Sequence, residues 1–145
     1  MPRLDYTKIA PEGYQKLVDV LGYIKASGLE EPLIHQVYLH VSQINGCPYC
    51  IDLHFRDAIE AGVDARKLNS LSVFRDVAFF TERERAALEW AETVTIMGHQ
   101  YEISPIYDRV KEQFNEKELV DLTFAISLMN TFNRIGIAFN AVPKV

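Results

Sequence analysis

Apolar residues recur at the spacing of an α-helix along most of this sequence, and this periodicity constrains the fold more than any other feature. Two such faces are Leu17, Val18, Leu21 and Ile24, and then Ile34, Val37, Tyr38, Val41 and Ile44. Alternating β-branched runs joined by hairpin turns are missing from the sequence. The one Asn-Gly pair, Asn45-Gly46, lies between two helical patterns and therefore ends a helix. We expect an all-α fold.

Turn and capping residues divide the chain into about six or seven helices. Thr81 with Glu84, and Asn115 with Glu118, have the spacing of a capping box, which begins a helix. Glycines and prolines mark most of the other boundaries. The expected helices run over about 11–26, 30–44, 47–61, 64–72, 81–96, 104–114 and 118–142.

The length and composition favour one compact domain over residues 1–145. A chain of 145 residues with 48% apolar residues can bury roughly two thirds of its unfolded surface. Its net charge of -5 and the absence of a basic cluster argue against binding to nucleic acid or to an anionic membrane.

Neither end of the chain looks like a membrane or export segment. The N-terminus lacks the basic and then apolar order of a secretory signal, so we expect a cytoplasmic protein. The last helix is the most apolar, but Asn130, Asn133 and Arg134 interrupt the run of about 20 apolar residues that a membrane span needs. A buried helix or a subunit interface suits it better.

The stretch VSQINGCPYCIDLH contains both cysteines of the chain and carries its most specific chemistry. A cysteine at the start of a helix lies beside unpaired backbone N–H groups, which favour the thiolate. Cys47, Cys50 and His54 are three and then four residues apart, so they share one helical face. Such a unit supports thiolate attack on a peroxide, capture of the sulfenic acid by the second thiol, and reduction by an external dithiol. The proximity of His54 favours Cys50 as the attacking and Cys47 as the resolving sulfur.

Other interpretations of the same residues stay open. Two cysteines can simply be buried at a helix contact, because free cysteine is among the most buried residue types. A zinc site is the second alternative, with Cys47, Cys50 and His54 joined by His35 or His40 from the preceding helix. A thioredoxin-like fold is disfavoured, since no strand precedes the motif. We expect His99 at the surface.

The segments SQINGCPYCIDLH, DAIEAG and TERERAALEWAETVT resemble the carboxymuconolactone decarboxylase and alkylhydroperoxidase D family, most of all its small alkylhydroperoxidase D-like members. The resemblance implies an all-helical, cofactor-free homo-trimer or homo-hexamer that reduces hydroperoxides. It also implies catalytic thiols at Cys47 and Cys50, and a relay histidine at His54. The expected reductant is a dithiol, such as a lipoylated or thioredoxin-like protein.

One position departs from that family. Its proton relay also uses a glutamate twelve residues before the first cysteine, where this chain has His35. Glu31, one turn earlier on the same face, is placed to pair with His35 and supply a carboxylate. Ser42, two turns after His35 on that face, is a candidate hydroxyl for this network, and a serine that only packs between helices is the alternative. Alternatively, His35 is itself a base or a metal ligand.

The leading hypothesis is therefore a thiol peroxidase that works through a Cys47/Cys50 dithiol and disulfide cycle, with His54 in proton transfer. A second hypothesis is a helical oligomer without enzymatic activity, which uses the Cys and His residues as a structural metal site or redox sensor. A third is a decarboxylase-like enzyme acting on a small lactone. The cysteine pair disfavours the third, because the decarboxylase branch lacks it.

Overall fold

The computed structural model describes residues 1–99 and 102–144, and within these ranges it is helical with no strand. The all-α prediction is thus confirmed. The α-helices are α1 (Tyr6–Ile9), α2 (Pro11–Lys25), α3 (Glu31–Asn45), α4 (Pro48–Glu60), α5 (Ala65–Asn69), α6 (Glu82–Thr95), α7 (Ser104–Val110) and α8 (Glu116–Ala138). Two short 3-10 helices, η1 (Leu71–Val73) and η2 (Met97–His99), join them. The side chain of His99 lies outside the described part of the chain.

The described ranges hold eight α-helices, where about six or seven were expected. The extra helix is α1, a single turn that lacks the apolar repeat of a longer helix. The predicted helix over 64–72 is divided into α5 and η1, because the chain leaves the α-helical conformation at Ser70. The helix predicted to reach Phe114 ends at Val110 and continues as turns.

The predicted start and stop signals act as expected. Both capping boxes form. The Thr81 side chain accepts from the Glu84 N–H, and the Asn115 side chain accepts from the Glu118 N–H. In return, the carboxylate of each glutamate accepts a hydrogen bond from the backbone N–H of its capping residue. Gly46 ends α3 in the left-handed region at a φ of 70°, a conformation that glycine adopts without a side-chain clash.

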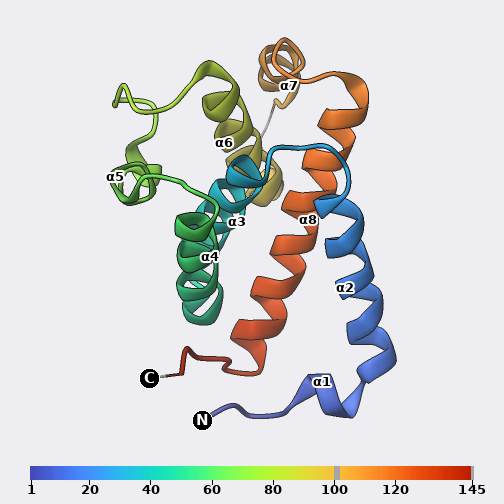
Figure 1. Ribbon diagram of the computed structural model, residues 1–145. Helices are drawn as coiled ribbons and strands as arrows, with labels where there is room; N and C mark the ends of the chain where they lie inside the picture. Colours follow the sequence, from blue (N-terminus) through green and yellow to red (C-terminus); the bar gives the residue numbers. More distant parts are fainter. Residues whose placement is uncertain (100–101, 145) are drawn as a thin grey trace.

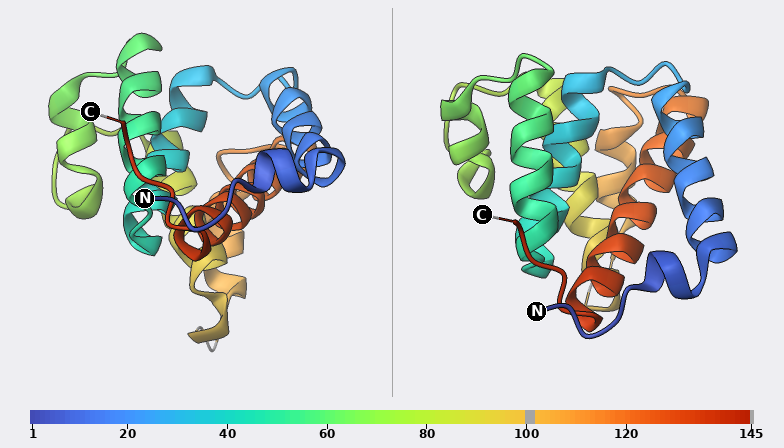
Figure 2. Two further views of the ribbon diagram at one scale, coloured as in Figure 1. Left: turned by 90° about the horizontal axis from the view of Figure 1, so that it is seen from below. Right: turned by 60° about the horizontal axis from the view of Figure 1, so that its bottom comes forward.

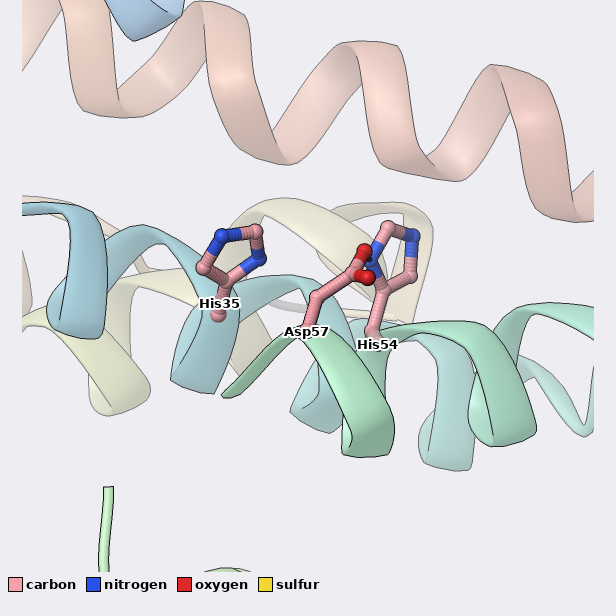
Figure 3. Close-up of side chains that lie close together, drawn as sticks. All are labelled: His35, His54 and Asp57. Atoms are coloured by element: carbon pink, nitrogen blue, oxygen red, sulfur yellow. Dashed lines mark ion pairs between the residues drawn. The ribbon is translucent and has the colours of Figure 1, made fainter. Parts of the chain in front are cut away.

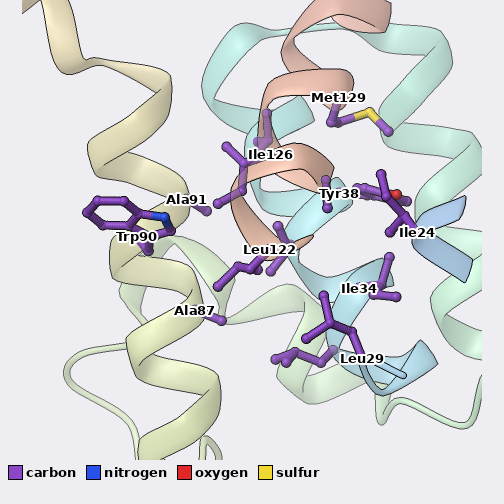
Figure 4. Packing of buried hydrophobic residues seen from close by; sticks show 14 of the residues in the cluster. Ile24, Leu29, Ile34, Tyr38, Ala87, Trp90, Ala91, Leu122, Ile126 and Met129 are labelled. Atoms are coloured by element: carbon purple, nitrogen blue, oxygen red, sulfur yellow. The ribbon is translucent and has the colours of Figure 1, made fainter. Parts of the chain in front are cut away.

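Helix α3 lies at the centre of the bundle and packs against α4, α6 and α8, while α2 runs along another side of α8 (Figures 1 and 2). Its face bearing Ile34, Val37, Tyr38 and Val41 is buried as predicted, but Ile44 in the last turn is 38% exposed. Figure 4 shows this core, where α3 and α8 meet α6 at Ala87, Trp90 and Ala91. The bundle therefore fixes α4, with the cysteine motif at its start, against a buried helix.

The two ends of the chain meet at the end of the bundle where α8 stops (Figure 1). The Arg3 N–H donates to the Phe139 carbonyl at 2.8 Å, and the Arg3 guanidinium donates to the Ala138 carbonyl at 2.8 Å. The N-terminal segment is thus tied to the end of α8 before it enters α1. Among the described residues, no helix has the length and apolarity to cross a membrane.

Candidate active site

The cysteine pair lies at the N-terminus of α4, as the motif predicts. Cys47 is the residue that caps the helix, and its Sγ accepts a hydrogen bond from the Cys50 backbone N–H at 3.4 Å. Pro48 occupies the first turn, where its missing N–H leaves no bond unmade. Both sulfurs are free and buried. The turn therefore holds two reduced thiols side by side.

The two thiols differ strongly in acidity. The pKa of Cys47 is lowered to about 7, chiefly because the Cys50 thiol donates a hydrogen bond to its sulfur, with the Cys50 backbone N–H and the Asn133 amide acting in the same direction. The pKa of Cys50 is raised, mainly by that same hydrogen bond and then by burial. The negative charge of the resting pair therefore lies on Cys47, the sulfur that we expected to resolve.

Helix α8 completes the surroundings of the two sulfurs with residues that the sequence analysis did not assign to the site. A Cβ atom at Gly136 would lie 3.1 Å from the Cys47 sulfur and 3.8 Å from the Cys50 sulfur. The Asn133 amide lowers the pKa of both thiols. The available signal was an asparagine and a glycine, three residues apart, on the most apolar helix of the chain.

Cys50 and His54 line one cavity of about 200 Å³, which we call the thiol cavity. Its other walls are mostly aromatic and apolar, and include Tyr6, Tyr49 and Phe132. His54 is buried, and its pKa is lowered to about 4, first by burial and second by the neighbouring His35. At neutral pH the imidazole is therefore uncharged.

A second and larger cavity, of about 640 Å³, is also lined by His54; we call it the histidine cavity. Its walls include His35, Asp57 and Glu31. Asp57 Oδ2 lies 3.5 Å from His54 Nδ1, and Glu31 Oε1 lies 3.6 Å from His35 Nε2. The Glu31 and His35 pairing is present as expected. The carboxylate beside His54, however, is Asp57, three residues later on α4 and missed by the sequence reasoning.

Of the two roles considered for Ser42, the structure shows helix packing and no hydrogen bond to His35. The hydroxyl of Ser42 is fully buried and accepts a hydrogen bond from Asn133 Nδ2 at 3.0 Å. Asn133 Oδ1 in turn accepts from Asn45 Nδ2 at 2.9 Å. Ser42 therefore helps to hold the asparagine that contacts the thiols, and it joins α3 to α8.

The four ligands of the alternative zinc site do not come together. Among the described residues, the group with donor atoms close enough to hold a metal ion is His35, His54 and Asp57, without either cysteine (Figure 3). His40 is not part of this group, and its Nε2 lies 3.0 Å from Glu92 Oε1. The thiols and the imidazoles thus form two neighbouring clusters that share His54.

Comparison with known proteins gives a consistent assignment. The sequence pattern of the carboxymuconolactone decarboxylase family matches residues 11–93. The uncharacterised protein YdfG of Bacillus subtilis is 35% identical over 136 residues, which is 94% of this chain and 92% of YdfG. The uncharacterised protein YnjA of Escherichia coli is 26% identical over 80% of this chain, which spans 63% of YnjA.

Two solved structures share the fold. One is a protein of unknown function, ATU0492 of Agrobacterium tumefaciens, whose name proposes an antioxidant defence protein AhpD. It has a TM-score of 0.95 and 33% identity, and the match covers 100% of this chain and 99% of ATU0492. An uncharacterised peroxidase-related protein of Silicibacter sp. TM1040 has a TM-score of 0.81 at 20% identity, over 92% of this chain and 71% of that protein.

Proposed function

We propose that this chain, which belongs to the carboxymuconolactone decarboxylase family, is a peroxidase-type thiol oxidoreductase of the alkylhydroperoxidase D-like kind. The observation that carries the proposal is the reduced Cys47 and Cys50 pair at the start of α4, with Cys50 and His54 lining the same cavity. The mostly apolar walls of that cavity suit a small organic hydroperoxide. The antioxidant and peroxidase-related names of the two structural relatives agree with this function.

Cys50 is the attacking sulfur in the proposed cycle, because it lines the thiol cavity whereas Cys47 is fully buried. Its proton passes to the neutral His54 as the sulfur attacks the peroxide oxygen. The O–O bond breaks, Cys50 becomes a sulfenic acid, and the leaving alkoxide takes the proton from His54 as alcohol.

The charge on Cys47 suits the second step. A thiolate with a lowered pKa is already a nucleophile when the sulfenic acid forms. Cys47 attacks the Cys50 sulfur and closes the disulfide, and the displaced hydroxide takes up a proton to leave as water. An external dithiol then reduces the disulfide. We propose a lipoylated or thioredoxin-like protein as this donor.

The missing family glutamate is compensated in this proposal by Asp57. A carboxylate 3.5 Å from His54 Nδ1 stabilises the imidazolium that forms while the proton is held. Glu31, beside His35, provides a second carboxylate at the far side of the histidine pair. The proton relay through His54 thus keeps nearby carboxylates, although His35 stands where the family has a glutamate.

Mass spectrometry of the reduced protein after one equivalent of hydroperoxide tests the cycle. We expect an intrachain disulfide between Cys47 and Cys50. In the Cys47→Ser variant, we expect a sulfenic acid trapped on Cys50, because the resolving sulfur is gone. The Cys50→Ser variant is the matched control and should form neither product. Two free thiols in the folded, peroxide-treated protein would overturn the proposal.

A further inference from the structure

We propose that His35, His54 and Asp57 form a binding site for a divalent transition-metal cation of the zinc type, in the histidine cavity. One donor atom from each of these residues lies within 4.8 Å of the other two. His35 comes from α3, whereas His54 and Asp57 come from adjacent turns of α4. Figure 3 shows the three side chains side by side, with the Asp57 carboxylate between the two rings.

Two unpartnered nitrogen atoms point independently to a ligand. Nδ1 of His35 and Nδ1 of His54 are buried, and neither makes a hydrogen bond. The His54 side chain is only 9% exposed, and its nearest carboxylate oxygen, at 3.5 Å, is too far for a good hydrogen bond. Buried polar groups without a partner are rare in proteins and need an explanation. A cation between the two rings would satisfy both nitrogens.

The spacing and donor types fit such an ion. Two ligands bound to zinc at about 2.0–2.1 Å in tetrahedral geometry lie roughly 3.3 Å apart, close to the 3.5 Å between His54 Nδ1 and Asp57 Oδ2. Imidazole nitrogen with a carboxylate oxygen is a common zinc donor set, and three protein donors leave a position for water.

Glu31 supplies the outer contact that a metal-binding histidine usually has. When Nδ1 of His35 binds a metal, Nε2 carries the proton, and Glu31 Oε1 lies 3.6 Å from that nitrogen. A carboxylate in this place orients the ring and increases its basicity. The donors and their support thus come from α3 and α4 without any movement of the cysteine turn.

Binding would also act on the thiols, a consequence that rests on the proposed function. A cation on Nδ1 of His54 leaves the proton on Nε2, so the ring no longer accepts a proton from Cys50. Zinc would then slow the peroxide cycle without contacting either sulfur. The site would couple metal availability to thiol reactivity.

The binding test uses the full chain with both cysteines replaced by serine, so that thiolate cannot hold the metal. After chelator treatment and equilibrium dialysis against Zn²⁺, we expect one zinc per chain. Adding Asp57→Asn should weaken zinc binding at least tenfold. Loss of a residue that only hydrogen-bonds a metal ligand already lowers metal affinity by about 10–100-fold, and Asp57 is itself a proposed ligand. Asp52→Asn is the matched control: Asp52 is on the same helix, but pairs with Arg56 at 2.9 Å. It should bind zinc normally.

Cobalt gives a second measurement, because the visible spectrum of bound Co²⁺ reports its coordination. We expect the spectrum to be lost in the Asp57→Asn variant and kept in the Asp52→Asn variant. Circular dichroism and thermal melting verify that both aspartate variants stay folded. Absence of zinc from the cysteine-free protein would overturn the inference, and so would equal affinity in the Asp57→Asn and Asp52→Asn proteins. Neither outcome affects the result of the disulfide experiment, because that experiment uses the protein with both cysteines present. The zinc site and the peroxide cycle can therefore fail independently.

Discussion

At the scale of single residues, Gly136 decides how closely α8 approaches the two sulfurs. Most residues of a buried helix present at least a methyl group, but here the space next to the Cys47 sulfur holds only a hydrogen atom. A Cβ atom there would lie 3.1 Å from that sulfur, which is closer than ordinary van der Waals contact. The absence of a side chain is therefore part of the site.

Replacing Gly136 with alanine should disturb the thiol pair. We expect the free energy of unfolding to fall by about 1–3 kcal/mol, the usual effect of adding an atom to a tightly packed interior. Peroxide-dependent disulfide formation should also slow, because the sulfurs must move away from the Asn133 amide. Urea denaturation measures the free energy of unfolding, and alkylation of the remaining free thiols at successive times after peroxide addition measures the rate of disulfide formation.

Gly22→Ala is the matched control for this prediction. Gly22 lies inside α2 with open space around its Cα, so alanine there should raise stability by roughly 0.5–1 kcal/mol through helix propensity. Disulfide formation should be unchanged. If Gly136→Ala behaves like Gly22→Ala in both measurements, the close approach has no functional weight.

Whether the sequence could predict that residues lie together in the site depends on whether they belong to one helix. Cys47, Cys50 and His54 lie on one element, so their spacing alone predicted that they share a face. Asn133 reaches the thiols from α8, more than eighty residues away in the chain. Its part in the site depends on helix packing, which the helical periodicity does not specify. Asp57 was within reach of the same spacing argument but has no distinguishing motif.

At the scale of elements, the N-terminus of α4 supplies the charge stabilisation for the thiol pair. The backbone N–H groups of its first turn include those of Tyr49 and Cys50, and both lower the pKa of Cys47. The charge is thus held by a helix end in addition to the neighbouring thiol. This arrangement makes the state of the pair sensitive to pH close to neutrality.

The ultraviolet absorbance of the thiolate should rise with pH and show a midpoint near pH 7, because the pKa of Cys47 is lowered to about 7. Below this midpoint the sulfur is protonated, and above it the sulfur is charged. Cys50→Ala should move the midpoint up, since it removes the donor with the largest effect. Cys47→Ser should abolish the transition, and a midpoint unchanged in both variants would contradict this assignment.

The elements themselves were largely predictable, because their ends are chemically marked. Thr81 and Asn115 form the capping boxes that their sequence spacing predicts. The segment after Asp64 was less predictable: its apolar residues suit one helix, but tertiary packing of Leu68 and Leu71 divides it into α5 and η1. Short helices depend on such contacts more than on their own propensity.

At the scale of the whole molecule, α7 and α8 leave an apolar surface uncovered. Val120 and Phe124 are each 49% exposed and Tyr107 is 44% exposed. They line a groove of about 980 Å³ that also includes Trp90. Large exposed apolar patches usually mark a contact with another protein. Together with the assembly that the family resemblance implies, this surface suits a contact between copies of the chain.

Phe124→Glu should therefore reduce the size of the assembly. We expect the native chain to form a trimer or hexamer in light scattering, and the variant to give a smaller species, because a charge in an apolar interface has no partner. Val73→Glu is the control, since Val73 is similarly exposed, at 47%, but lies on η1. A native monomer, or equal loss of assembly in both variants, would contradict the proposed surface.

The N-terminal segment, tied by Arg3 to the end of α8, brings Tyr6 and Thr7 to the wall of the thiol cavity. These two residues lie outside the part of the chain that matches the family pattern, whereas both cysteines and His54 lie inside it. The reactive atoms thus lie inside the family pattern, whereas part of the cavity wall lies before it in the chain. During evolution, such a protein can change which substrates it admits by altering a few early residues, while the inherited chemistry stays as it was.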